Sequence, residues 1–320
     1  MTVRIMGTGS ALPQATVTND DLSKIMDTSD EWIRTRTGIE TRHLAQEETT
    51  VSLSVEAARR ALCDSGISAE ELDFIIVGTV TGDNVTPSCA CSVQAALGAR
   101  RAAAFDINAA CSGFLFALNT AYAYVNAGIY RTGLIIGAEV LSRIMDWTDR
   151  STCVLFGDGA GAAVVQAADR GLIRFEQGSD GERGAVLACP GRPNNNPLVS
   201  NPADPKYVHM DGQEVYRFAV TTVPASIQRV LSESGVGTEE VRWFILHQAN
   251  VRIIQSVEKR LKAGEEKFPV NLDHCANTSA ASVPILLDEM NRKGMLNRGD
   301  KIVLSGFGAG LTWGTALLEW

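Results

Sequence analysis

Apolar segments of two kinds alternate along the chain, and their spacing separates predicted strands from predicted helices. Short continuous runs are typical of buried strands, whereas apolar residues recurring every three or four positions are typical of amphipathic helices. The pattern predicts helices at 54–66, 87–98 and 112–128, and strands at 3–6, 73–78, 102–108, 134–137, 152–156 and 301–304. Because apolar strands alternate with helices, we expect an α/β fold whose sheets are covered on both faces.

Several features occur twice along the chain, in the same order. Residues 156–165 (FGDGAGAAVV) resemble 307–318 (FGAGLTWGTALL), and each reads as a strand, a glycine-rich turn and a second strand. Cys111 and Asn277 each precede a predicted helix that begins with small residues. Such internal similarity at a fixed order indicates repeated structural units.

The repetition predicts two similar α/β halves, residues 1–170 and 171–320. A further matched pair, 78–82 and 244–249, supports this division because each follows an apolar strand. The proline- and asparagine-rich stretch at 190–205 is predicted to be a long loop, and long loops in compact domains are often functional.

Composition restricts the possible partners and the location. The 320 residues suffice for two cores, and the net charge of −8 disfavours nucleic acid or an anionic membrane as partner. We see no signal-peptide core and no apolar stretch suited to a membrane, so we expect a cytoplasmic protein. The 7 cysteines show no zinc-site spacing, so we expect no bound metal. Several lie in apolar runs, such as those around Cys63 and Cys153, which predicts reduced thiols packed mostly in cores.

Cys111 is a candidate nucleophile because of its place between a strand and a helix. It lies in DINAACSGFLF, where an apolar strand ends and an apolar helix begins. The unpaired N–H groups and dipole of a helix start favour thiolate over thiol. Ser112 and Gly113 leave room for a substrate. The alternative interpretation is an inert, buried structural cysteine.

His247 and Asn277 are the next candidates. His247 follows four apolar residues at the end of a predicted strand, where α/β folds place ligand-facing residues. It could equally be a hydrogen-bonded core histidine. Asn277 precedes a predicted helix in HCANTSAAS, so it could simply be the N-cap of that helix.

The glycine-rich turns do not indicate a nucleotide site. The motif at 156–161 (FGDGAG) is followed by a predicted strand, whereas phosphate-binding loops lead into a helix. We interpret 306–310 as backbone that approaches another element closely, and Asp158 as a turn residue rather than a catalytic acid.

In combination, these segments resemble β-ketoacyl-[acyl-carrier-protein] synthase III, the initiating condensing enzyme of type II fatty acid synthesis. The resemblance covers nearly the whole chain. Besides the Cys111 segment, it rests on the motifs at 7–13 (GTGSALP), 30–39 (DEWIRTRTGI), 156–161 (FGDGAG), 247–250 (HQAN), 277–282 (NTSAAS) and 306–314 (GFGAGLTWG).

The resemblance implies a five-layered αβαβα thiolase fold, a homodimer and no metal or redox cofactor. It implies an acyl-CoA starter, malonyl-acyl-carrier protein as the second substrate, and Cys111 as the nucleophile that carries the acyl group. His247 and Asn277 would donate hydrogen bonds to the enolate left by loss of carbon dioxide. The enolate carbon would then attack the acyl-cysteine, and the backbone N–H groups of Cys111 and Ala309 would hold the oxyanion formed in that attack. Ala309 replaces a glycine common in the family, but only its N–H is needed.

The resemblance also implies binding residues. Trp32 and Arg150 would sandwich the adenine of coenzyme A, and Arg36, Gly212 and Asn250 would line its tunnel. Trp32 could otherwise be a core residue. Thr86 stands where the family reaches into the partner's acyl pocket, and its small size predicts primers longer or more branched than acetyl.

A basic helix face is predicted to dock the acidic carrier protein. It follows His247 and carries Arg252, Lys259, Arg260 and Lys262, with Ile253, Ile254, Val257 and Leu261 facing inward. The alternative is an ordinary solvated charged face.

Other functions remain open at this point. The segment 306–310 lacks the second cysteine of thiolases proper, and His274 is not expected to replace Asn277 as the second histidine of elongating synthases. A related condensing or acyl-transferring enzyme of secondary metabolism would keep the same three residues. A catalytically silent scaffold is the other alternative, although intact Cys111, His247 and Asn277 disfavour it.

Overall fold

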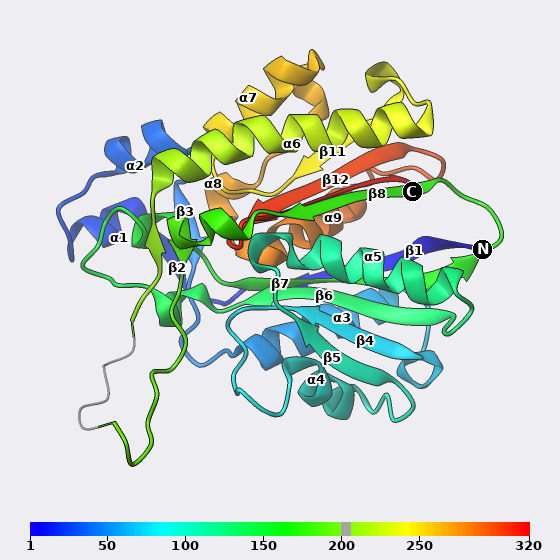
Figure 1. Ribbon diagram of the computed structural model, residues 1–320, viewed down its shortest axis with the longest axis horizontal. Coiled ribbons are helices and arrows are strands. Elements are labelled where there is room, and N and C mark those ends of the chain that lie inside the picture. The colour runs from blue at the N-terminus through cyan, green and yellow to red at the C-terminus, as the bar shows by residue number, and fades with distance from the viewer. Residues whose placement is uncertain (200–205) are drawn as a thin grey trace.

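The computed structural model describes residues 1–199 and 206–320 and contains two main β-sheets between layers of helices (Figure 1). The first sheet has the order β1 (Thr2–Ala11), β7 (Gly159–Ala168), β6 (Thr132–Glu139), β4 (Phe74–Gly78) and β5 (Ala103–Ile107). The second has the order β11 (Trp243–Leu246), β12 (Lys301–Gly308), β13 (Thr312–Glu319) and β8 (Ile173–Ser179).

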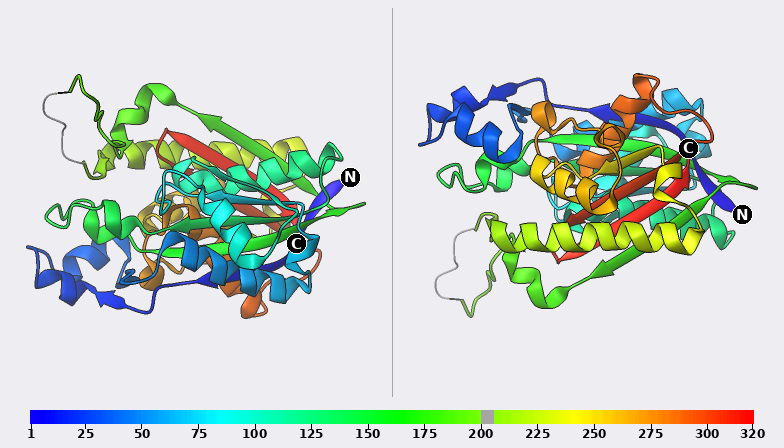
Figure 2. Two further views of the ribbon diagram at one scale, coloured as in Figure 1. Left: turned by 90° about the horizontal axis from the view of Figure 1, so that it is seen from below. Right: turned by 90° about the horizontal axis from the view of Figure 1, so that it is seen from above.

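Three helix layers complete the five-layered arrangement. The outer face of the first sheet packs against α3 (Thr50–Ser65) and α4 (Cys89–Leu97). The outer face of the second is covered by α6 (Gly212–Ser234) and α7 (Val251–Leu261), and Figure 2 shows α6 running across it. Between the sheets lie α5 (Gly113–Asn126) and α9 (Ser282–Arg292), which contact both and are therefore apolar over much of their surface.

The two sheets repeat one pairing scheme. In the first, β1 and β6 both run antiparallel to β7, and β4 runs parallel to β6. In the second, β8 and β12 both run antiparallel to β13, and β11 runs parallel to β12. The shared order supports the predicted division into similar halves, whose boundary at residue 170 stays a prediction.

Two expectations were wrong. The predicted strand at 152–156 is the 3₁₀ turn η4 (Cys153–Leu155), because its consecutive residues Cys153 and Val154 are both buried in the core instead of alternating in a ladder. Cys63 was expected inside the core but is exposed on α3. A short apolar run does not by itself distinguish a strand from another buried segment.

Smaller elements surround the ends of the sheets. They are the paired strands β2 (Thr16–Thr18) and β3 (Thr41–His43), the pair β9 (Leu187–Ala188) and β10 (His209–Met210), and the helices α1 (Asn19–Ser23), α2 (Asp30–Thr37) and α8 (Leu272–Cys275). Of the predicted loop at 190–205, residues 190–199 form no helix or strand, and 200–205 lie outside the described residues. Over the described part of the chain, no helix is long and apolar enough to span a membrane.

Candidate active site

Cys111 lies at the junction predicted for it, in the 3₁₀ turn η2 (Ala110–Ser112) between β5 and α5. Its side chain is buried, and the glycine turn after β12 packs directly against it. A β-carbon added at Gly308 would lie 2.7 Å from the backbone nitrogen of Cys111. The expectation that 306–310 approaches another element closely is therefore confirmed, and this element is the nucleophile turn.

Burial opposes ionisation of the Cys111 thiol. It raises the pKa of Cys111 to about 12, and the charge of Glu139 adds to this rise. The sequence predicted that the helix start would favour the thiolate. Burial acts against that effect, and thiolate formation at Cys111 stays a prediction.

His247 follows β11 and faces the same region. Its backbone N–H donates to the carbonyl of Ser305 at 2.8 Å, and its Nδ1 lies 2.6 Å from Oγ of Ser282, the first residue of α9. The ring meets Phe307 edge-on, with centroids 5.2 Å apart. Burial lowers the pKa of His247 to about 3, so the imidazole is neutral near pH 7.

Asn277 lies between α8 and the 3₁₀ turn η8 (Ser279–Ala281). Its backbone is fixed by hydrogen bonds of 3.0 Å to Leu155 and Gly157, and its Oδ1 accepts the N–H of Ser279 at 2.8 Å. Within residues 1–199 and 206–320, its Nδ2 has no protein acceptor. The N-cap of α9 is Ala281, so the N-cap interpretation of Asn277 was wrong.

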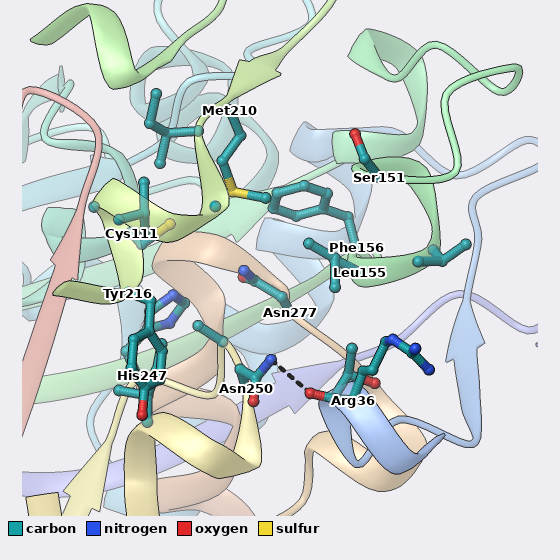
Figure 3. A pocket seen from close by; sticks show the side chains of 18 of the residues that line it. Arg36, Cys111, Ser151, Leu155, Phe156, Met210, Tyr216, His247, Asn250 and Asn277 are labelled. Carbon is teal, nitrogen blue, oxygen red and sulfur yellow. Dashed lines mark hydrogen bonds between the residues drawn. The ribbon is translucent and has the colours of Figure 1, made fainter. Parts of the chain in front are cut away.

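One cavity of about 260 Å³ is lined by Cys111, His247 and Asn277, and Figure 3 shows their side chains around a common space. The structure thus brings together three residues that lie far apart in the sequence, at positions 111, 247 and 277. The same cavity is lined by Arg36, Gly212 and Asn250, which the resemblance placed along the coenzyme A tunnel, and by Trp32, which it placed against the adenine.

The mouth of this cavity combines an aromatic ring with two cations. The guanidinium carbons of Arg36 and Arg150 lie 4.7 and 5.2 Å from the ring centroid of Trp32. Nδ2 of Asn250 donates to the carbonyl of Arg36 at 3.1 Å, as marked in Figure 3, and so joins α7 to α2. Arg150 also pairs with Asp27. Trp32 is half-buried, which suits a stacking surface better than a core position.

A second cavity, of about 680 Å³, also reaches Cys111. It is lined by Ala309, the predicted oxyanion donor, and by residues of the loop that precedes α4. Thr86 belongs to that loop and is exposed, and it lines neither of these two cavities in the described chain. The role of Thr86 in the acyl pocket stays a prediction.

The predicted docking residues lie on α7 as expected from their spacing. Arg252, Lys259 and Arg260 are exposed, whereas the four apolar residues of the helix are buried. Arg252 also donates to the carbonyl of Thr35 at 2.8 Å, so it is tied to α2 at the cavity mouth. Docking itself stays a prediction.

Sequence reasoning missed three residues that contact the site: Glu139, Ser279 and Ser282. The signal for Glu139 was present, because a charged residue after the apolar run of β6 marks the end of a buried parallel strand. The two serines lie in the motif NTSAAS, which was used only to place Asn277. No group of three or more potential metal ligands is found in the part of the chain that the structure describes.

Comparison with known proteins shows the family. Residues 105–181 match the description "3-Oxoacyl-[acyl-carrier-protein (ACP)] synthase III", and residues 231–320 match its C-terminal counterpart. A β-ketoacyl-[acyl-carrier-protein] synthase III from Clostridium acetobutylicum is 50% identical over 321 residues, covering 99% of this chain and 98% of the relative. The chain belongs to the β-ketoacyl-[acyl-carrier-protein] synthase III family. It is a condensing acyltransferase of the kind that initiates fatty acid synthesis.

Solved structures agree with this assignment. The 3-oxoacyl-[acyl-carrier-protein] synthase III from Aquifex aeolicus VF5 superimposes with a TM-score of 0.93 at 44% identity, covering 99% of this chain and 100% of that one. The priming β-ketosynthase of the R1128 polyketide pathway is also similar, with a TM-score of 0.91 and 36% identity over 99% of this chain and 96% of that one. The expected thiolase-like fold is confirmed.

Proposed function

We propose that this synthase III joins an acyl-CoA starter to malonyl-acyl-carrier protein through an acyl-Cys111 intermediate and releases a 3-oxoacyl-carrier protein and carbon dioxide. The observation that supports the proposal is the single cavity that joins the thiol of Cys111, the free amide nitrogen of Asn277 and the ring of His247. Each group suits one step of the condensation.

The first step is acyl transfer to Cys111. Its sulfur adds to the thioester carbonyl, and the resulting oxyanion accepts hydrogen bonds from the backbone N–H groups of Cys111 and Ala309. The intermediate then expels coenzyme A, whose thiolate takes up the proton released by Cys111.

The second step is loss of carbon dioxide from the malonyl group. We assign the Ser282 hydroxyl as the donor to Nδ1 of His247, 2.6 Å away, so that the ring proton lies on Nε2. This N–H and the NH₂ group of Asn277 stabilise the enolate oxygen in a buried site. The enolate carbon attacks the acyl-Cys111 carbonyl, and the N–H groups of Cys111 and Ala309 stabilise the tetrahedral oxyanion. When this intermediate collapses, Cys111 leaves as a thiolate that takes up one proton from solvent.

The remaining predictions concern ligands, assembly and location. Trp32 and Arg150 would stack on the adenine of coenzyme A, while Arg36, Gly212 and Asn250 line the approach to Cys111. The chain would act as a cytoplasmic homodimer without a resident metal or cofactor, and neither nucleic acid nor membrane would be a partner. These statements are proposals that rest on family membership and on the cavity.

A second candidate keeps the chemistry and changes the pathway. The similarity to a priming ketosynthase of polyketide synthesis favours it, because both proteins share the fold over nearly their whole length. The clostridial relative is more similar in sequence, so we favour fatty acid synthesis. Identification of the carrier protein that the purified enzyme prefers would separate the two.

The test of the site separates the two half-reactions. His247→Ala and Asn277→Ala should still accept an acyl group from acyl-CoA, because Cys111 and the backbone N–H groups remain. Each variant should decarboxylate malonyl-carrier protein about 10²-fold more slowly or worse, as expected for loss of one oxyanion donor. Malonyl decarboxylation at the normal rate in both variants would refute the assigned roles.

A further inference from the structure

Glu139 is a buried carboxyl group that the condensation described above does not use. It is the last residue of β6 and is 0% exposed. No Lys, Arg or His within the described residues forms an ion pair with it. A buried carboxylate without a cation is costly unless hydrogen bonds replace its water shell. Its position therefore needs a physical reason.

Hydrogen-bond donors surround this carboxyl group. They are the N–H of Val80 at 3.1 Å and the hydroxyl groups of Thr81 at 2.5 Å, Thr79 at 3.2 Å and Ser279 at 3.2 Å. The two threonine oxygens themselves accept backbone N–H groups, so their protons point to Glu139. Four donors directed at one side chain suit an ionised carboxylate, which only accepts hydrogen bonds.

Ser279 connects this carboxylate to the active site. Its hydroxyl group donates to Oε1 of Glu139, and its backbone N–H donates to Oδ1 of Asn277 at 2.8 Å. Ser279 has a φ of +51°, a left-handed conformation that is uncommon for serine and must be held by its surroundings. The residue therefore joins β6 of the first sheet to the loop that carries Asn277.

We propose that Glu139, acting through Ser279, is a positioning residue that fixes the amide of Asn277 with its NH₂ group facing the cavity. The inference rests on the proposed function of Asn277 as an oxyanion donor. If Ser279 were released, the amide could rotate by 180° and present its oxygen to the enolate oxygen. Two acceptors would then face each other, and the stabilisation would be lost.

Glu139 also acts on the nucleophile. The charge of Glu139 raises the pKa of Cys111. Glu139→Gln removes the charge, so alkylation of Cys111 should become faster. Ser279→Ala removes the hydroxyl group that donates to Glu139 and keeps the backbone N–H. Both variants should nevertheless slow decarboxylation, because both loosen the support of Asn277.

The experiment measures three rates for each variant. Burial raises the pKa of Glu139 to about 7, so assays at pH 8 keep the native carboxylate ionised. Decarboxylation of malonyl-carrier protein should fall about tenfold in Glu139→Gln and in Ser279→Ala. Iodoacetamide labelling of the Cys111 peptide should become about threefold faster in Glu139→Gln, because the neighbouring negative charge is removed. Acyl transfer from acyl-CoA to Cys111 reports whether each variant is folded.

Matched controls are available elsewhere in the chain. Asp288→Asn changes another buried carboxylate that accepts two hydroxyl groups, and Ser54→Ala removes another buried serine hydroxyl. Both controls should keep the native decarboxylation rate. The proposal is overturned if decarboxylation is unchanged in the Glu139 and Ser279 variants, or if all three rates fall together in both. If Asn277→Ala itself decarboxylates normally, the proposed function fails instead.

Discussion

At the scale of single residues, the site depends on keeping side chains neutral and oriented. Burial lowers the pKa of His247 to about 3, so its ring is neutral near pH 7, and burial raises the pKa of Cys111 to about 12. A neutral imidazole donates through only one nitrogen, and the partner of the other nitrogen decides which. Here Oγ of Ser282 lies 2.6 Å from Nδ1, and with the serine assigned as the donor the ring proton lies on Nε2.

Ser282 should therefore affect catalysis without touching the substrate. In Ser282→Ala the ring loses the donor to Nδ1, so the tautomer with its proton on Nδ1 becomes populated and Nε2 ceases to donate. We expect malonyl decarboxylation to fall about tenfold while acylation of Cys111 is retained. Ser282→Thr keeps a hydroxyl group and should recover much of the rate. Equal decarboxylation by wild type and Ser282→Ala would contradict this role.

At the scale of elements, the sequence predicted the parts that have a regular period. The helices around 54–66, 87–98 and 112–128 were recognised because their apolar faces follow helical spacing. The segment at 152–156 was not, because it buries successive residues in a 3₁₀ turn. Cys111, His247 and Asn277 could be found from motifs at element ends. The Glu139–Ser279 contact could not, because it joins residues 140 positions apart.

The exposed face of α7 leads to a prediction about the carrier protein. Arg252→Glu combined with Lys259→Glu should raise the Michaelis constant for malonyl-carrier protein about tenfold, or about 1.4 kcal/mol, because an acidic partner loses attraction. The effect should weaken with added salt. The rate of acyl transfer from acyl-CoA should change less.

The control for α7 is a charge reversal of equal size on another surface. Arg59→Glu with Arg170→Glu changes two exposed arginines outside the cavity mouth and should leave the Michaelis constant unchanged. Wild-type kinetics of the α7 variant at low salt would place the docking surface elsewhere.

At the scale of the whole molecule, the structure leaves a sheet edge open beside the second cavity. Among the described strands, β5 pairs only with β4, and open strands are sites where a second chain can add. The nearby loop exposes Val85, with 82% of its surface accessible, and Thr86 next to it. This arrangement is consistent with the expected homodimer, in which Thr86 would enter the acyl cavity of the partner.

Primer choice should therefore depend on the residue at position 86 of the other protomer. Wild type should accept primers longer or more branched than acetyl, and Thr86→Phe should restrict it to short ones. In a mixed dimer, Cys111→Ala and Thr86→Phe can be carried by the same protomer, leaving Cys111 only on the wild-type one. Loss of long primers in that dimer supports action across the interface. Unchanged primer choice there would show that Thr86 does not reach the partner's site.

The central claim is that Cys111 carries the acyl group between the two substrates. The most direct measurement is mass spectrometry of the protein after exposure to a series of acyl-CoAs, followed by malonyl-carrier protein. We predict one acyl group per chain, on the peptide that contains Cys111, and its disappearance as 3-oxoacyl-carrier protein forms. Cys111→Ser should not condense, because its hydroxyl group is a far weaker nucleophile. Full condensing activity in Cys111→Ala, or an acyl group found stably on another residue, would contradict the account.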